Sequence, residues 1–142
     1  MVTYFKDQPS NASRALQIWQ ILIGKAHNRQ TLTYGMLAQL LGFKGAGTLA
    51  HPLGHIMHYC QLNNLPPLTV LVVNQDTGIP GDGLVGDKLQ VAREGVFRLN
   101  WYAIIPPSPQ EMSQIYKAQQ DAPMVPELPT VTPSSSEYLV SE

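Results

Sequence analysis

The first half of the chain shows the spacing of three to four residues between apolar positions that is typical of amphipathic helices. In residues 15–26, Trp19 and Ile23 fall on one apolar stripe that the neighbouring leucines and isoleucines widen. Asn11 or Ser13 precedes the stripe and can cap the helix. We therefore expect a first helix, packed broadly against the core and closed by the polar segment 27–30.

Two shorter helices follow, separated by a glycine-rich joint. Thr33 can cap the first of them and Gly42 can end it, with leucines 37, 40 and 41 facing inward. Pro52 is compatible with a helix only in its first turn, so the second helix is expected to begin near Thr48 or His51. Its predicted core stripe consists of Leu53, Ile56, Met57 and Cys60. This outline is that of a helix-turn-helix, in which the second helix usually meets nucleic acid.

The pattern changes to β-branched and apolar residues at Leu68–Asn74, which predicts a buried strand. Asp87–Glu94 can form a short helix that Gly95 ends. Val96–Ile105 alternates well enough to predict a second strand, paired with the first. Helices followed by a two-stranded wing give the predicted fold class: mainly α with a small β wing, in a winged helix-turn-helix.

Composition changes at Pro106, where seven prolines fall within 28 residues. The expected organisation is a loose N-terminus (1–11), one domain (12–105) and a Pro-rich acidic tail (106–142). One helix is expected in the tail, at 110–120, docked by Met112, Ile115 and Tyr116. The remainder reads as disordered.

Charge and cysteine usage narrow the function classes. The net charge is −1, with seven Lys or Arg against four acids in residues 12–102 and an acidic balance afterwards. A single cysteine, Cys60, excludes an intramolecular disulfide framework and fits a cytoplasmic protein. It reads best as a small apolar core residue. No apolar run approaches the ~20 residues that a membrane span needs, so no membrane partner is expected.

The order and spacing of several short motifs resemble the DNA-binding domain of the O6-alkylguanine-DNA alkyltransferases, and also the non-catalytic alkyltransferase-like proteins. The motifs are the Thr-Tyr-Gly at 33–35, the Asn/Pro turn at 63–67, the loop GIPGDGL at 78–84 and the Glu-Gly pair at 94–95. The resemblance covers roughly residues 15–99. It implies a winged helix of the alkyltransferase C-terminal domain type and a role in DNA repair.

The resemblance also implies which residues meet DNA. The family's tyrosine at the start of the first helix of the pair pushes on the phosphate 3′ to a flipped base, and Tyr34 matches it. A phenol and free helix N–H groups both suit a phosphate. The family's second helix enters the minor groove with small residues and an intercalating arginine. The position of that arginine falls near Ala50 or His51, so it is missing here or replaced by an imidazole. The predicted DNA-binding residues are Tyr34, Gly35, Lys44, Ala50, His51, Gly54, His55 and His58.

The family's chemistry is not expected here. Its alkyl-acceptor cysteine lies in a Pro-Cys-His-Arg stretch, which corresponds to about 69–72, where neither a thiol nor its activating histidine is present. The prediction is therefore no catalytic residue and no enzyme activity, and Glu94, the family's activating glutamate, is expected to cap or pair locally. The resemblance places a pocket for a modified or flipped base among Val70, Asn74, Gly81, Asp82 and Gly83.

Other interpretations were weighed for the three histidines. Imidazoles at 51, 55 and 58 share one helical face and can bind zinc at such spacing, but no fourth ligand is assured, so no metal and no cofactor are predicted. A polar recognition face is favoured. The preferred function is non-catalytic DNA binding. The alternative is a winged-helix module that binds protein, without lesion recognition, through the apolar strand and the C-terminal tail.

Overall fold

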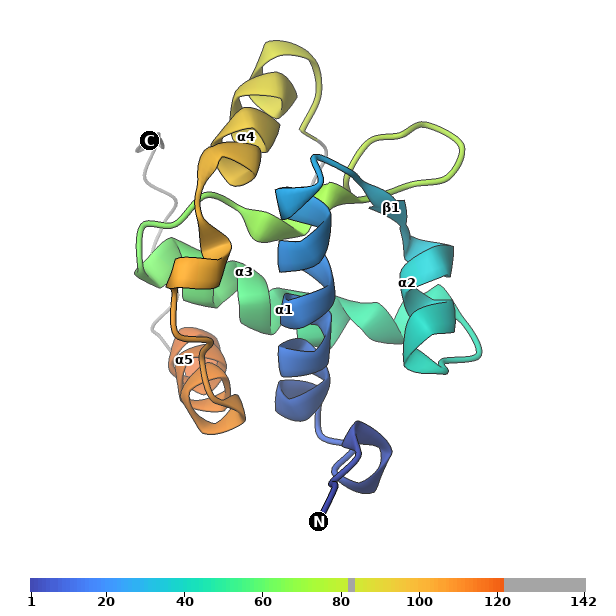
Figure 1. Ribbon diagram of the computed structural model, residues 1–142, viewed down its shortest axis with the longest axis vertical. Helices are drawn as coiled ribbons and strands as arrows, with labels where there is room; N and C mark the ends of the chain where they lie inside the picture. The colour runs from blue at the N-terminus through green and yellow to red at the C-terminus, as the bar shows by residue number, and fades with distance from the viewer. Residues whose placement is uncertain (82–83, 122–142) are drawn as a thin grey trace.

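The computed structural model describes residues 1–81 and 84–121 as a mainly helical body (Figure 1). The long helices are α1 (Asn11–His27), α2 (Tyr34–Leu41), α3 (Ala50–Leu62), α4 (Gly86–Arg98) and α5 (Pro109–Asp121). Four 3-10 helices connect or precede them: η1 (Phe5–Asp7), η2 (Ala46–Leu49), η3 (Leu68–Leu71) and η4 (Trp101–Ala103). Two short strands, β1 (Leu32–Thr33) and β2 (Val72–Val73), complete the described elements.

Helix α1 is the central element, against which α2, α3 and α5 pack (Figure 1). Its N-cap is Ser10, one residue before Asn11 and three before Ser13, the two predicted candidates. The Ser10 Oγ accepts a hydrogen bond from the Ser13 N–H at 3.0 Å. Trp19 is fully buried and meets the rings of Tyr59 and Trp101 edge-on, with centroids 5.5 and 5.6 Å away. The predicted apolar stripe of this helix is thus confirmed as the centre of the core.

The small sheet differs from the predicted wing. Strand β2 pairs in parallel with β1, with Leu32 opposite Val72 and Thr33 opposite Val73. The predicted second strand at Val96–Ile105 is wrong: its first residues continue α4 and the rest form η4 and extended chain. The mainly helical class with a small β element is confirmed, and its sheet joins segments from before α2 and after α3.

Gly95 does not end α4, which continues to Arg98. Gly95 faces Pro66, and a Cβ at this position would lie 3.6 Å from the proline Cβ. A glycine inside a helix costs about 1 kcal/mol relative to alanine, which close packing against another segment can offset. Trp101 then covers this end of the helix, since its Nε1–H donates to the Val96 carbonyl at 2.7 Å.

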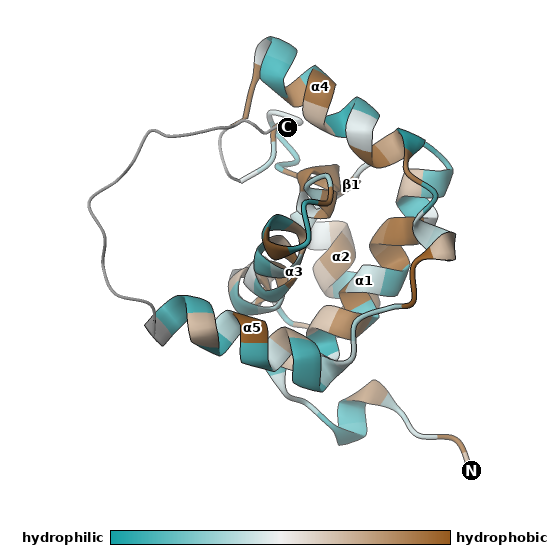
Figure 2. Cartoon of the chain, turned by 90° about the vertical axis from the view of Figure 1, so that its left-hand side faces the viewer, coloured by the Kyte–Doolittle hydropathy of each residue, from teal (hydrophilic) through white to brown (hydrophobic). Residues whose placement is uncertain are grey.

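Helix α5 confirms the predicted helix in the Pro-rich segment. Met112 is fully buried, and Ile115 and Tyr116 are half-buried against the body. Figures 1 and 2 show α5 beside α1 and α3, on the opposite side of the molecule from α4. None of the helices in the described ranges is long and apolar enough to cross a bilayer. The predicted disorder beyond residue 121 lies outside the described residues.

Candidate nucleic-acid interface

Helices α2 and α3 form the expected pair around a tight joint. The Thr33 Oγ1 accepts a hydrogen bond from the Met36 N–H at 3.0 Å, and Gly42 ends α2 in the left-handed region at φ 78°. Pro52 lies in the first turn of α3, as predicted. One predicted core position of α2 is wrong: Leu37 and Leu41 are buried, but Leu40 is 60% exposed on the outer face.

Tyr34, the first residue of α2, lies against the glycine loop that follows β2. Its hydroxyl accepts a hydrogen bond from the Gly81 N–H at 2.8 Å, across 47 positions of sequence. A side chain at position 81 would collide with that hydroxyl, so the contact requires glycine. The phenol keeps its own proton to donate, because only its oxygen lone pair is used.

The parallel strand pair explains why these two segments meet. Because Thr33 lies opposite Val73, the start of α2 and the end of β2 are held side by side. The loop then folds back, with the Asn74 N–H donating to the Ile79 carbonyl at 2.9 Å and a bridge between Val73 and Pro80. Tyr34 and the loop are therefore brought together by the backbone rather than by side chains alone.

The predicted contacts at the joint are accessible. Gly35 at the start of α2, Lys44 after its end, and Ala50 and His51 at the start of α3 are all exposed. Neither helix carries an acidic residue in its first turn, so no carboxylate offsets the partial positive charge of either N-terminus, although the Thr33 hydroxyl caps one N–H group of α2. The start of α2 and the start of α3 can each accept an anionic group without desolvating a carboxylate.

The rest of the predicted α3 face is covered by α5, which corrects the prediction that it is open to DNA. The rings of His55 and Tyr116 stack at 4.0 Å between centroids and 10° between planes. The Tyr116 hydroxyl lies 2.9 Å from His51 Nδ1, and the centroid of the Tyr116 ring is 5.6 Å from that of the His58 ring. His55 is only 5% exposed, and Gly54 faces the edge of the Tyr116 ring. The physical reason is that Met112 anchors α5 in the core one turn before Tyr116.

The geometry of His55 fixes its protonation. Its Nδ1 lies 2.7 Å from the His51 carbonyl oxygen, which can only accept, so Nδ1 carries the proton. Burial lowers the pKa of His55 from its ordinary value, with smaller contributions from the charges that His51 and His58 can carry; the bond to the His51 carbonyl opposes them. The neutral ring is therefore the form that stacks on Tyr116. Within the described ranges, no three His, Cys, Asp or Glu side chains form a group able to hold a metal ion.

The described members of the predicted base pocket do not share one environment, because Val70 is buried whereas Asn74 and Gly81 are exposed. Val70 is fully buried within η3, together with Leu68 and Leu71, because this segment packs under α1 and α4. Asn74 is exposed, but its Oδ1 accepts from the Asp76 N–H at 3.2 Å and closes a local turn. Asp82 and Gly83 lie outside the described residues.

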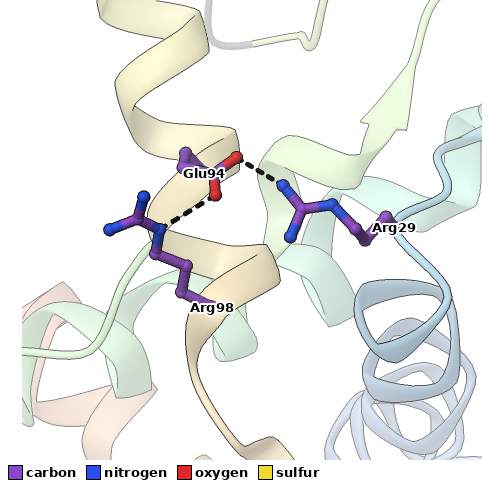
Figure 3. Close-up of polar contacts among 3 residues, drawn as sticks. All are labelled: Arg29, Glu94 and Arg98. Carbon is purple, nitrogen blue, oxygen red and sulfur yellow. Dashed lines mark hydrogen bonds and ion pairs between the residues drawn. The ribbon is translucent and has the colours of Figure 1, made fainter.

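Two further side chains behave as the sequence predicted. Cys60 is 1% exposed, and burial raises the pKa of its thiol to about 12. Glu94 pairs locally, as predicted, with its Oε2 2.9 Å from Nε of Arg98 one turn later, and it also pairs with a distant residue, its Oε1 lying 2.6 Å from Arg29 Nη2 (Figure 3). These pairs lower the pKa of Glu94, the Arg98 hydrogen bond contributing most. Glu94 thus forms a bridge between α4 and the segment after α1.

Sequence reasoning missed Tyr116 as a partner of the histidines. The sequence contained both parts of this contact, the histidine face and a helix with a docking stripe, but nothing in it says which surface the stripe covers. Two hollows flank the resulting seam. One, of about 400 Å³, lies between Ser10–Ala12 of α1, His55 and the start of α5. The other, of about 420 Å³, is lined by His58, Leu62 and the later part of α5.

In comparisons with known proteins, no protein-family model, no curated protein and no solved structure matches this chain.

Proposed function

We propose that this chain is a non-catalytic DNA-binding protein of the alkyltransferase-like type. The observation that carries the proposal is the hydrogen bond between the Tyr34 hydroxyl and the Gly81 N–H at 2.8 Å. A tyrosine that contacts the phosphate beside a flipped base has to lie close to the loop that lines the base pocket. The two motifs, widely separated in sequence, meet as that role requires.

The accessible end of the helix pair supports phosphate contact. Gly35 has no side chain to keep a phosphate away from the first N–H groups of α2, and the neighbouring Tyr34 hydroxyl can donate a further hydrogen bond. Lys44 is exposed in the joint and adds a positive charge. Phosphate contacts of this kind position a duplex without reading its sequence.

Several residues favour binding over chemistry. Alkyl transfer needs a thiolate activated by a neighbouring base. The chain has Thr69, Val70 and Leu71 in the region where the family's acceptor motif would fall. The buried Cys60, with its raised pKa, is held in the thiol form near neutral pH. A sensing role, in which a modified base is bound and not repaired, fits these residues.

One observation favours a second candidate, binding to another protein. Met36 and Leu40 lie one turn apart on α2 and are 49% and 60% exposed, forming a small apolar strip. Phosphate-tracking proteins usually cluster basic residues, whereas Arg29 and Arg98 here are both paired with Glu94. The buried β2 strand, in contrast, cannot be the contact that the sequence suggested, since Val72 and Val73 are at most 5% exposed.

The two candidates are separated by fluorescence anisotropy with a short labelled duplex, with and without one O6-methylguanine, across a salt series. The proposal predicts salt-sensitive binding that is tighter for the modified duplex, and about tenfold weaker for Tyr34→Ala. Tyr4→Ala, which removes a 59% exposed tyrosine near the N-terminus, is the matched control and should bind as the wild type does. No binding to either duplex at low salt would overturn the DNA proposal in favour of a protein partner.

A further inference from the structure

Helix α5 occupies the face of α3 that the resemblance to the alkyltransferases assigns to DNA. His51, Gly54, His55 and His58 all belong to the predicted contact face of α3, and all of them lie against Tyr116. A duplex and α5 cannot both occupy this face. Either α5 leaves when DNA binds, or DNA uses only the exposed joint at the other end of the pair.

The contact between α5 and α3 depends heavily on one side chain. The Tyr116 ring stacks on His55 at 4.0 Å, its hydroxyl lies 2.9 Å from His51 Nδ1, and its edge fills the space over Gly54. A Cβ at position 54 would lie 3.1 Å from Tyr116 Cε1, so the absence of a side chain there is what lets the ring approach α3. Tyr116 therefore contacts the imidazole rings of His51, His55 and His58 and holds α5 against α3; we call this side chain the latch.

The seam between α5 and α3 leaves one polar atom unpaired and is open to solvent on both sides. The Nδ1 atom of His58 is buried and has no hydrogen-bond partner among the described residues, which is an unfavourable state for an imidazole nitrogen. Hollows of about 400 and 420 Å³ lie on either side of the latch. Water or a ligand that reached the face after α5 left could satisfy the polar atoms that α5 leaves unpaired.

We infer that α5 is a displaceable cover over the α3 face, latched by Tyr116, and that a DNA duplex takes its place when it binds. The inference rests on the proposed function. DNA can replace the contacts that α5 makes with the histidines. Imidazole rings that stack on the Tyr116 ring and bond its hydroxyl can also stack on a base or donate hydrogen bonds to phosphate oxygens. Lys44 in the exposed joint and Gly35 at the start of α2 remain available for a first encounter while the cover is closed.

If DNA binds only molecules in which α5 has left the α3 face, the apparent affinity equals the intrinsic affinity multiplied by the fraction of open molecules. Opening withdraws the Met112 side chain from the core, and burial of one such side chain corresponds to roughly a thirtyfold to hundredfold preference for the closed state. Loss of the stacked, hydrogen-bonded Tyr116 ring should raise the open fraction by about tenfold. The apparent affinity of full-length Tyr116→Ala for a duplex should rise by the same factor.

The test compares wild type, Tyr116→Ala and Lys117→Ala as full chains, by anisotropy with the unmodified and O6-methylguanine duplexes. Lys117 is the matched control, because it is exposed on the same helix and next in sequence. Each protein is first checked for cooperative unfolding. Backbone hydrogen exchange of wild-type residues 109–121, with and without duplex, provides a second measurement that needs no variant.

The expected result is tighter binding by Tyr116→Ala, unchanged binding by Lys117→Ala, and faster exchange in α5 of the wild type once duplex is bound. Equal affinities for wild type and Tyr116→Ala, together with unchanged exchange in α5 on binding, would overturn the cover and leave DNA binding standing. Absence of binding by all three proteins at low salt would instead overturn the proposed function, and the role of α5 in it.

Discussion

The replacement Met112→Ala tests how firmly α5 is docked on the body. Met112 is the one fully buried side chain of α5, and it lies one turn before the Tyr116 latch. Truncation to alanine removes three heavy atoms from the core and leaves a void where the α5 seam meets α1 and α3. The backbone of α5 is not perturbed, because alanine is the best helix former.

The expected loss follows from burial. Truncations of buried methionine or leucine to alanine cost about 2–5 kcal/mol, depending on how far the site collapses. Helix α5 packs on α1 and α3 from one side and can move towards them when the side chain is shortened, so we expect the lower part of that range, about 2–3 kcal/mol. For a domain whose total stability is typically about 5–15 kcal/mol, this is a large fraction.

Urea denaturation followed by tryptophan fluorescence measures this loss, since Trp19 and Trp101 are both buried. The midpoint should fall while the slope stays close to that of the wild type. Met36→Ala is the control: Met36 is 49% exposed on α2, and its truncation should change stability by less than about 0.5 kcal/mol. A loss below about 1 kcal/mol for Met112→Ala would show that α5 does not rest on the core in solution, and would refute the docking described above.

Two further predictions concern titratable groups. The folded pKa of His55 lies below its unfolded value near 6.5, so the unfolded chain takes up a proton first as pH falls; stability should therefore be lower at pH 5.5 than at pH 7.5. Urea denaturation at the two pH values measures this difference in stability. His55→Gln should reduce the difference, whereas His27→Gln, which replaces an exposed histidine, should keep it. The same difference in both variants would contradict the attribution of the pH dependence to His55. Cys60, with a pKa of about 12, should react with a thiol reagent at pH 8 roughly a thousandfold more slowly in the native protein than in urea. A native rate within tenfold of the unfolded rate would mean that the thiol is accessible.

The helices were the part of the fold that local patterns could predict. Their apolar spacing and cap residues are read within one or two turns, which is why Thr33 and Gly42 were assigned correctly as the ends of α2. The errors at Leu40 and Gly95 have a common cause, because each depends on which other segment lies nearby. No segment among the residues that the structure describes covers Leu40, whereas Pro66 packs against Gly95.

The strand pairing and the covering of the α3 face by α5 also depend on which segments lie side by side, and here those segments are far apart in the sequence. Local patterns therefore could not predict them. The alternation in Val96–Ile105 fitted a strand, but the partner of Val72–Val73 is Leu32–Thr33, some 40 residues earlier. Parallel pairing leaves no local turn signal that would identify the partner. Likewise, the docking stripe of α5 was visible in Met112 and Tyr116, but not that it would cover His51 and His55.

The most direct test of the account is an NMR titration of the 15N-labelled full chain with a short duplex containing one O6-methylguanine, recorded at low salt. DNA binding through the helix pair predicts that amide shifts concentrate at residues 33–36 and 44–58, and that α5 signals at 109–121 change with them. Shifts confined to α4 and to the segment after it, or no shifts at all, would contradict the proposal that this helix pair is the DNA-binding surface.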